Sequence, residues 1–437
     1  MSLLSRVGVF AAKTICPSVI LLGAVVLSVC QIGCRGTEDE VDVLQGDFTV
    51  PQIENFEVTG ASTVKIDLSK EGEVSNVVVM QKDGENEEGK DGKEGGEKQS
   101  QDKEVEGKPE EQSPQNGGEK TDGEEKADGI EKPDGGIETT VSYTDEGKGV
   151  VVSMNQPTEV GEEYVIQGEV EDKNGNSLTF SIPFTGYNEN PARLIISEVR
   201  NAYGTASIKD ENGDSQKVHR SEYVELYVLK GGNLCGLEIC SAYDGEKKKY
   251  QLPKIYVNAG EFITVHMRTV DAEGFDGEGM ESELEDDLTL STHEDSCDTA
   301  RDLWSQNTKS CLGDSDIVFI RNIYDGSIVD ALVYAKSTVS AWKEAYGDIV
   351  DALKKSGVWS GSVEPDGAVC SDLITASAAT RSFSRQNVAE AAAAFESGNE
   401  IYNGKDVWMI TANSGTVKNA IAGITPGFEN SSNEYKK

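Results

Sequence analysis

The sequence predicts an all-β protein made of two immunoglobulin-like β-sandwiches, the second of which carries helical insertions. Short runs of alternating apolar residues recur between turn signals from residue 193 to 335. A second set of such runs covers residues 47–187, and a long acidic stretch that lacks them interrupts this set. Many short strands separated by turns are typical of sandwiches.

Ten runs have the composition and the alternation of strands. They are TVKIDL, EVSNVVVM, TTVSYT, GVVVSM, EEYVIQGEVED, SLTFSIPF, RLIISEV, EYVELYVL, GEFITVHM and DIVFIRNIYDGSIVDALVYA. In the run 223–228, alternation puts Val224 and Leu226 on one face and Glu225 on the other. One face of such a sheet packs on the core and the other faces solvent, so Glu225 is expected to be exposed to solvent.

The N-terminus is predicted to be a bacterial lipoprotein signal peptide, residues 1–33. Arg6 and Lys13 precede an uncharged apolar run of eleven residues, 19–29, which is too short to span a membrane. Cys34, after Ile32 and Gly33, resembles a lipoprotein cleavage box better than Cys30 does, although Gln31 departs from the usual aliphatic residue. Lipidation of Cys34 would anchor the chain by acyl chains at the cell or outer membrane, with residues 34–47 as a tether. An ordinary secretory signal, with Cys34 left as a thiol, is the alternative.

The charge of the chain argues against nucleic acid as a partner. The formal net charge is −38, and removing residues 1–33 takes away two basic groups and no acids, which gives −40. Binding to polyanions needs clustered Lys or Arg free of interleaved acids. The triplet Lys247 to Lys249 is the one candidate, and it is expected at the tip of a hairpin.

The first sandwich is assigned to residues 48–190 and holds an acidic insert, residues 82–136. The insert has nine Lys against nineteen acids, and Val105 and Ile130 are its only branched aliphatic residues. It cannot bury a core, so it is predicted to be a disordered loop. A solvated spacer and a partner-catching loop are both compatible with this composition.

Two loops raise the question of calcium binding. Residues 172–176 and 210–214 alternate acidic and amide side chains around Asn174-Gly175 and Asn212-Gly213. Their spacing lacks the Gly at position six and the bidentate acid at position twelve of a helix–loop–helix calcium site. Type I′ hairpin turns are therefore expected.

The second sandwich, residues 191–437, resembles the lamin-tail domain in the order of its motifs. The matching motifs are Ser197-Glu198-Val199, Glu222-Tyr223-Val224-Glu225-Leu226, Leu234-Cys235-Gly236-Leu237-Glu238-Ile239, Tyr250-Gln251-Leu252-Pro253, Gly260-Glu261-Phe262-Ile263-Thr264-Val265, Asp325-Gly326, Ile328-Val329-Asp330, Ser382-Phe383-Ser384-Arg385, Trp408 and Thr425-Pro426-Gly427-Phe428-Glu429-Asn430. The resemblance implies an immunoglobulin-like binding or scaffolding module without catalytic residues to carry over. In the first sandwich, residues 161–178 resemble the last hairpin of bacterial Ig-like and fibronectin type III-like domains.

Two insertions are expected in the second sandwich, residues 268–314 and 336–380. The first holds an acidic run, residues 281–287, which is expected to be a solvated face rather than a calcium site. The second holds a helix, in which apolar residues fall at helical spacing from Trp342 to Leu353, with Ser337 or Thr338 as its cap and Gly357 as its stop. This helix either packs on the sandwich as a lid or offers a groove to a partner. A second, Ala-rich helix is predicted for residues 388–397.

Cysteine use favours an oxidising compartment. Five cysteines follow Cys34, and the short-loop disulfide guesses are Cys235 with Cys240 and Cys297 with Cys311, although spacing does not fix connectivity. Cys370 is left over. Neither pair has zinc-type spacing with a histidine partner.

No catalytic set, metal site or cofactor motif is found. Cys297 stands where the second histidine of an H-E-x-x-H zinc motif beginning at His293 would be. A hydrolase centred on Glu225 conflicts with its solvent-facing position. We therefore expect a non-enzymatic, exported envelope lipoprotein, periplasmic or surface-exposed, that binds a protein or glycan ligand. The alternatives are an accessory or degenerate domain of an exported hydrolase, of nuclease or phosphatase type, and a passive structural lipoprotein.

Overall fold

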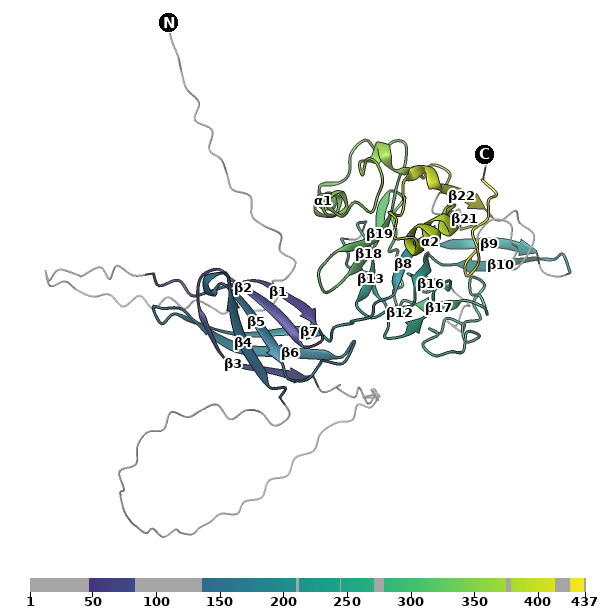
Figure 1. Ribbon diagram of the computed structural model, residues 1–437. Helices are drawn as coiled ribbons and strands as arrows, with labels where there is room; N and C mark the ends of the chain where they lie inside the picture. Colours follow the sequence, from purple (N-terminus) through teal and green to yellow (C-terminus); the bar gives the residue numbers. More distant parts are fainter. Residues whose placement is uncertain are drawn as a thin grey trace, which may run out of the picture. The chain divides into compact units, whose positions relative to one another are not determined.

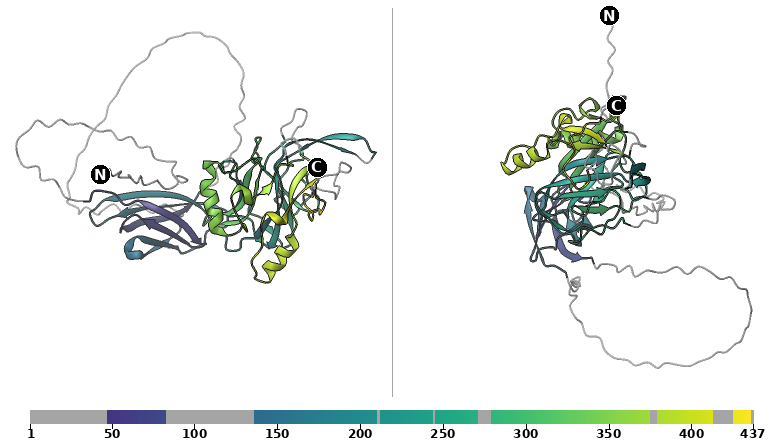
Figure 2. Two further views of the ribbon diagram at one scale, coloured as in Figure 1. Left: turned by 90° about the horizontal axis from the view of Figure 1, so that it is seen from above. Right: turned by 90° about the vertical axis from the view of Figure 1, so that its right-hand side faces the viewer.

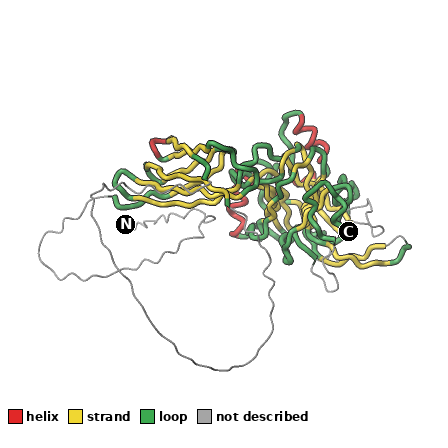
Figure 3. Tube along the Cα trace, turned by 90° about the horizontal axis from the view of Figure 1, so that it is seen from below, coloured by secondary structure: helices red, strands yellow, loops and turns green. Residues whose placement is uncertain are grey.

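The protein is all-β, with two sandwiches and little helix (Figures 1 and 3). The computed structural model describes residues 47–82, 136–209, 212–243, 245–270, 279–374, 379–412 and 425–435. Cys34, the signal peptide, most of the tether and residues 83–135 of the acidic insert lie outside these ranges. In the described ranges, none of the helices is long and apolar enough to cross a membrane.

The N-terminal sandwich has a four-stranded sheet, β1-β2-β5-β4, and a three-stranded sheet, β3-β6-β7, and each neighbouring pair is antiparallel. The strands are β1 (Ile53–Gly60), β2 (Thr63–Leu68), β3 (Glu73–Gln81), β4 (Thr139–Thr144), β5 (Gly149–Met154), β6 (Glu163–Glu171) and β7 (Ser177–Thr185), with a 3-10 turn η1 (Asp145–Gly147). The predicted alternation is confirmed in β2, where Val64, Ile66 and Leu68 are buried. They share one core with Val150 and Ile166 from β5 and β6.

The hairpin between β6 and β7 confirms that residues 172–176 form a turn. Asp172 accepts hydrogen bonds from the backbone N–H of Asn174 at 2.8 Å and of Asn176 at 3.0 Å, and it pairs with Lys70 at 2.6 Å. The type I′ prediction is wrong, because only Gly175 of the Asn-Gly pair has positive φ, at 79°. The loop has five residues and the Asp172 carboxylate organises it.

The C-terminal sandwich pairs a six-stranded sheet, β17-β16-β11-β8-β21-β22, with a five-stranded sheet, β14-β13-β18-β19-β20. Their bounds are β8 (Arg193–Arg200), β11 (Tyr223–Lys230), β13 (Leu237–Ser241), β14 (Tyr250–Gln251), β16 (Phe262–His266), β17 (Arg301–Trp304), β18 (Asp316–Asn322), β19 (Ile328–Ala335), β20 (Val369–Cys370), β21 (Arg381–Arg385) and β22 (Trp408–Ala412). Both sheets contribute to one large core. Every strand predicted in this half is present.

Two smaller ribbons accompany these sheets. Strands β9 (Gly204–Lys209) and β10 (Ser215–Arg220) form an antiparallel hairpin that projects from the C-terminal sandwich in Figures 1 and 2, with Gly213 at φ 83° in its turn. Strands β12 (Gly232–Asn233) and β15 (Tyr256–Val257) pair separately. The Lys247–Lys249 triplet lies between the paired strands β13 and β14, as the hairpin prediction requires.

The expected insertion 268–314 contributes a strand that was not predicted. β17 pairs with β16 in parallel, with Ile263 opposite Arg301. Its four residues, Arg-Asp-Leu-Trp, are too few and too polar to show alternation in the sequence. Residues 301–304 of this insertion therefore form the edge strand of the six-stranded sheet.

The two predicted helices are present. They are α1 (Gly347–Ser356), preceded by the 3-10 turn η2 (Glu344–Tyr346), and α2 (Val388–Glu396); the remaining 3-10 turns are η3 (Pro365–Gly367) and η4 (Lys405–Val407). Gly357 ends α1 at φ 71°, as expected. The capping prediction is wrong, because Ser337 bonds to Asp372 instead and α1 starts ten residues later. Val350 and Leu353 enter the main core, so α1 packs as a lid.

The Asp172 turn leads to a stability prediction. Replacing Asp172 with Ala removes the acceptor for the turn amides and the partner of Lys70, so we expect a lower urea midpoint at pH 7. The hydrogen bonds and Lys70 hold the pKa of Asp172 below its usual value. Its stabilisation is therefore present above the unfolded pKa of about 3.9 and is lost as the pH falls through the folded value.

The measurement is urea unfolding of both chains from pH 2 to 7. Asn174→Ala is the matched control, because the Asn174 side chain is exposed and its backbone N–H remains. A difference between Asp172→Ala and the parent that does not shrink at low pH would contradict this account.

Candidate functional site

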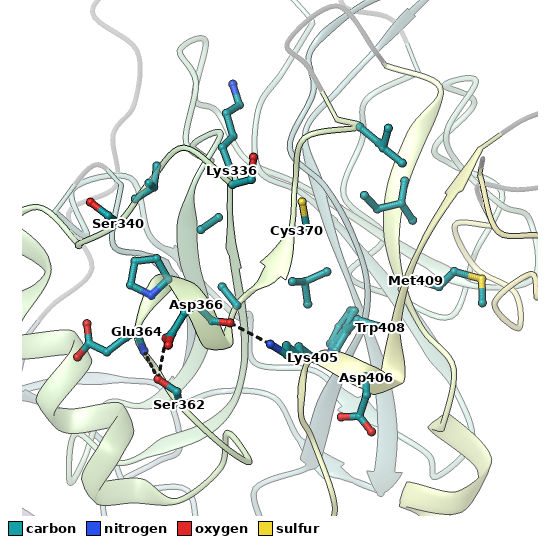
Figure 4. Close-up of a pocket in the computed structure, with 18 of the residues that line it drawn as sticks. Lys336, Ser340, Ser362, Glu364, Asp366, Cys370, Lys405, Asp406, Trp408 and Met409 are labelled. Atoms are coloured by element: carbon teal, nitrogen blue, oxygen red, sulfur yellow. Dashed lines mark hydrogen bonds between the residues drawn. The ribbon is translucent and has the colours of Figure 1, made fainter. Parts of the chain in front are cut away.

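One candidate site is a groove of about 1100 Å³ in the C-terminal sandwich, which we call the edge groove. Figure 4 shows its lining. It is lined by Ala335, Lys336, Ser337, Val339, Ser340, Ser362, Glu364, Pro365, Asp366, Ala368, Val369, Cys370, Leu373, Lys405, Asp406, Trp408, Met409, Ile410, Glu434 and Tyr435. The lining contains no histidine and belongs to segments far apart in the sequence.

The walls of the edge groove are the last strands of two sheets. β20 ends the five-stranded sheet and β22 ends the six-stranded sheet in the described chain, and residues of both line the groove. An edge strand has one row of N–H and C=O groups that its own sheet does not use. The groove therefore borders the main-chain groups of two sheet edges, part of which Glu434 and Tyr435 use on β22. Its apolar floor includes Trp408 and Val369, both largely buried.

Hydrogen bonds fix the shape of one end of the groove. The Lys405 Nζ donates to the Asp366 carbonyl at 2.9 Å, which joins the turn before β22 to the turn before β20 (Figure 4). The Ser362 hydroxyl lies 3.2 Å from the Asp366 carboxylate and accepts from the Glu364 N–H at 3.1 Å. The Trp408 indole N–H is held by Asn403 at 2.9 Å. The groove is thus preformed at this end.

The lining of the groove is acidic. The lining contains four carboxylates, of Glu364, Asp366, Asp406 and Glu434, and two lysines, Lys336 and Lys405, so its formal charge is −2. Glu364 is half-exposed and pairs with Lys354 at 2.8 Å, and the Asp406 carboxylate accepts from the Tyr402 hydroxyl at 2.6 Å. A ligand with basic groups would be favoured electrostatically.

Several residues of the lamin-tail-like motifs meet in a buried polar network. It lies on the face of the six-stranded sheet that is turned away from the five-stranded sheet. Glu198 and Glu225 are cross-strand neighbours on β8 and β11, and both are fully buried. The Glu198 carboxylate accepts from Ser382, from Ser384 at 3.1 Å and from the Thr425 N–H at 3.0 Å.

The expectation that Glu225 faces solvent is wrong. Its carboxylate accepts from Ser197 and from the Gly427 N–H at 2.5 Å. Alternation identified the outer face of β11 correctly, but three segments cover that face. They are α2, which packs on Ile195 and Leu229, residues 425–430, and residues 279–300. Gly427 is required for this approach, because a Cβ there would lie 2.6 Å from that of Cys297.

A second part of the network ties the two sheets together. Asp330 of β19 accepts from the Ile196 N–H at 2.7 Å, from Arg385 at 2.9 Å and from Asn403 at 3.0 Å. The Asn430 amide donates to the Ser197 and Arg385 carbonyls, each at 2.9 Å. The motif residues that support the resemblance therefore hold the fold together, which is a structural role.

Two buried histidines, His266 and His293, lie beside Trp304. His266 stacks on Trp304 with ring centroids 3.7 Å apart, and its Nε2 lies 2.8 Å from Asp302. Burial lowers the pKa of His266 to about 3 and that of His293 to about 4. In the part of the chain that the structure describes, no group of three or more His, Cys, Asp or Glu side chains is placed to hold a metal ion.

The acidic run 281–287 is only partly a solvated face. Glu283 is fully buried and accepts from the backbone N–H groups of Ser291 at 3.2 Å and Asp302 at 2.7 Å. Burial raises the pKa of Glu283 above its usual value. The prediction is wrong for this residue because Glu283 organises the covering segment 279–300.

The predicted disulfides are not formed. Cys235, Cys240, Cys297, Cys311 and Cys370 are all free thiols, and only Cys370 is exposed. Cys297 contacts the Thr299 hydroxyl at 3.1 Å, whereas Cys311 donates to the Met267 carbonyl at 3.0 Å, so each of these two thiols has its own partner. Cys240 is part of the main core. Spacing in the sequence carried no information on these positions.

The edge groove itself was not predicted as a site. Its lining comes from the end of β19, the loop before β20, β22 and residues 434–435, and no periodic pattern links these segments. The signal that was present is Trp408, which the motif comparison singled out. Edge positions depend on sheet order, which alternation does not report.

The buried carboxylate pair gives a pH-dependent prediction. Burial and then the neighbouring Glu198 raise the pKa of Glu225 well above its usual value. Between the unfolded pKa, about 4.3, and the raised folded value, the folded state binds the proton more tightly, so stability falls as the pH rises. Glu225→Gln does not ionise. We expect its stability relative to the parent to rise by up to about 1.4 kcal/mol per pH unit within that window.

Urea unfolding at several pH values from 4 to 8 tests this, with the exposed Glu73→Gln as control. A difference between Glu225→Gln and the parent that does not change with pH would show that Glu225 is ionised in the folded protein.

Comparison with known proteins places the C-terminal sandwich in a family. The family model TP_1001_2nd, described as a protein second domain, matches residues 192–410, half of the chain. An uncharacterized protein of Treponema pallidum (strain Nichols) is 32% identical over 193 residues, which cover 44% of this chain and 44% of that protein. The chain thus matches less than half the length of this relative.

Two solved structures show weaker likenesses. A DUF4876 family protein from Bacteroides thetaiotaomicron matches at a TM-score of 0.29 and 12% identity, over 67% of this chain and 96% of that one. The N-terminal part of the bacterial S-layer protein SbsC matches at 0.20 and 13% identity, over 48% and 38%. These scores carry no argument about function. On the match to residues 192–410, the chain belongs to the TP_1001_2nd family of second domains.

Proposed function

We propose that this is a lipid-anchored envelope protein that binds another polypeptide through the edge groove and performs no chemistry of its own. The observation that carries the proposal is that the edge groove is bounded by the edge strands of both sheets of the C-terminal sandwich. Such edges are used to bind extended peptides through main-chain hydrogen bonds, with neighbouring pockets for side chains.

The chemistry of the lining supports binding rather than catalysis. The four groove carboxylates lie among lysines, hydroxyls and backbone groups, and at least three of them, Glu364, Asp366 and Asp406, have side-chain partners of their own. The carboxyl groups with the most strongly raised pKa values in the described chain, Glu225 and Asp302, are buried and do not line the groove. A substrate in the groove would meet no pair of groups resembling a nucleophile and its base.

The sequence supports the anchoring part of the proposal. The Ile32-Gly33-Cys34 box and the short apolar run before it are typical of lipoprotein signals. Lipidation of Cys34 would hold the groove near a membrane on the exported side. A protein or glycan on that side of the membrane is then the accessible partner, and the main-chain edges favour protein.

Selection of peptides from a random display library against the purified full chain tests the groove. We expect selected peptides to be extended and basic, and to lose at least tenfold in affinity towards Cys370→Arg, because the new side chain enters the groove. Thr338→Arg adds the same charge at an exposed residue outside the lining and should leave the affinity unchanged. Peptides that bind both variants equally would exclude the groove as the site.

Detergent partitioning tests the anchor. With Triton X-114 extraction of bacterial cells expressing the full chain, we expect the parent in the detergent phase and Cys34→Ser in the aqueous phase, because two or more acyl chains give stable membrane binding. Cys30→Ser is the matched control and should partition like the parent. Recovery of the parent in the aqueous phase would contradict lipidation.

A further inference from the structure

We propose that the edge groove binds its ligand as an added antiparallel strand on β22, and that residues 431–435 of this chain already occupy part of that strand position. This inference rests on the proposed function and specifies its ligand. The ligand is an extended polypeptide with an aromatic residue followed by basic residues. The chain's own segment is then an intramolecular competitor for the same edge.

Glu434 and Tyr435, at the end of this segment, pair with β22 as residues of a strand would. Glu434 forms an antiparallel bridge with Thr411, and the Tyr435 N–H donates to the Ile410 carbonyl at 2.7 Å. Both Glu434 and Tyr435 line the groove. The structure therefore shows directly that the outer edge of β22 accepts a strand in this direction.

More of the β22 edge lies beyond this bridge. On the inner side, the Gln386 N–H donates to the Val407 carbonyl. The backbone N–H and C=O groups of Val407 and of every second residue after it are therefore directed towards β21. Trp408 therefore directs its N–H and C=O to the same outer edge as Ile410. Trp408 also lines the groove, so a strand longer than the present contact would continue along the groove wall.

The contacts of Tyr435 indicate that a ligand strand should carry an aromatic side chain at this position. The Arg381 guanidinium lies 4.1 Å from the centroid of the Tyr435 ring, and its Nη2 donates to the Tyr435 hydroxyl at 2.7 Å. Tyr435 also packs against the main core. A cation stacked on an aromatic ring contributes about 0.5 to 2 kcal/mol. A competing peptide would gain this contact only with an aromatic residue at the same register.

The charge of the groove specifies the residues that come after the aromatic one. An antiparallel strand that continues past the Tyr435 position runs towards Met409 and Trp408, next to Asp406 and across from Asp366. Because successive side chains of a strand alternate between its faces, one of two consecutive basic residues at those positions would face the carboxylates of the groove. In the sequence, Lys436 and Lys437 come directly after Tyr435, so this chain contains the proposed ligand pattern.

Covalent attachment gives the chain's own segment an advantage. Residues 425–430 are fixed to the sheet, because Glu198 accepts from the Thr425 N–H and Glu225 accepts from the Gly427 N–H. The next residues are thus held beside β22 at a high effective concentration. An outside ligand must displace only the Glu434 bridge and the Tyr435 ring contact. Without covalent attachment, such a short contact would compete weakly.

The test supplies the segment in trans. A chain ending at Asn430 is titrated against a fluorescent peptide of residues 430–437, and binding is followed by anisotropy. We expect saturable binding to the shortened chain and at least tenfold weaker binding to the full chain, whose own segment competes. Tyr435→Ala in the peptide should cost at least tenfold, because the Arg381 contact is lost.

Backbone methylation separates strand addition from side-chain binding. N-methylation of Tyr435 in the peptide removes the donor to the Ile410 carbonyl and should abolish binding. N-methylation of Glu434 is the matched control. It should preserve the hydrogen bond from the Tyr435 N–H to the Ile410 carbonyl, since the Glu434 N–H donates to Ser432 within the segment and not to β22. Equal binding of the Tyr435-methylated and parent peptides would overturn the proposal.

The two proposals fail in different ways. If the shortened chain is folded by circular dichroism and binds no peptide, strand addition is wrong, whereas library peptides sensitive to Cys370→Arg would still support the groove. If the shortened chain does not fold, full-length Tyr435→Ala replaces it, and peptide binding no stronger than to the parent chain counts against the proposal.

Discussion

Two carboxylates that water cannot reach determine how the C-terminal sandwich is built. Glu198 and Glu225 lie side by side on the outer face of a sheet, where a sandwich of this type ordinarily meets solvent. Burying a carboxylate costs several kcal/mol unless hydrogen bonds compensate. The donors come from Ser197, Ser382 and Ser384 and from the backbone of residues 425–427, so the pair dictates that this remote segment covers the sheet.

The same principle extends over the rest of that face. Asp295 is fully buried, and although burial would raise its pKa, Arg200 and Arg220 hold it well below its usual value. Residues 279–300 are thereby fixed across β8, while α2 covers the neighbouring apolar patch at Ile195. The covering layer is specified by polar contacts at its ends and by apolar packing in the middle. This layer does not include the outer edge of β22, which Glu434 and Tyr435 contact beside the edge groove.

Sequence alternation predicted the strands well, because each strand reports its own faces. Val64, Ile66 and Leu68 in β2, and Val224 and Leu226 in β11, are buried as the period of two requires. Alternation could not predict what covers the second face, and for that reason Glu225 and Glu283 were misplaced. It also could not predict β17, which is too short, or the groove, which depends on which strands end each sheet. The free thiols show the same limit, since spacing along the chain does not give distance in space.

The hydrogen bond from Thr425 to Glu198 joins residues that are 227 positions apart. A chain made from its N-terminus exposes β8 and β11 long before it contains their cover. Until residue 427 has emerged, the Thr425 and Gly427 N–H groups that donate to the two carboxylates are missing. The cover over this pair is therefore completed only by the last part of the chain, which would suit the exported chain proposed above, since such a chain must stay unfolded while it is moved between compartments.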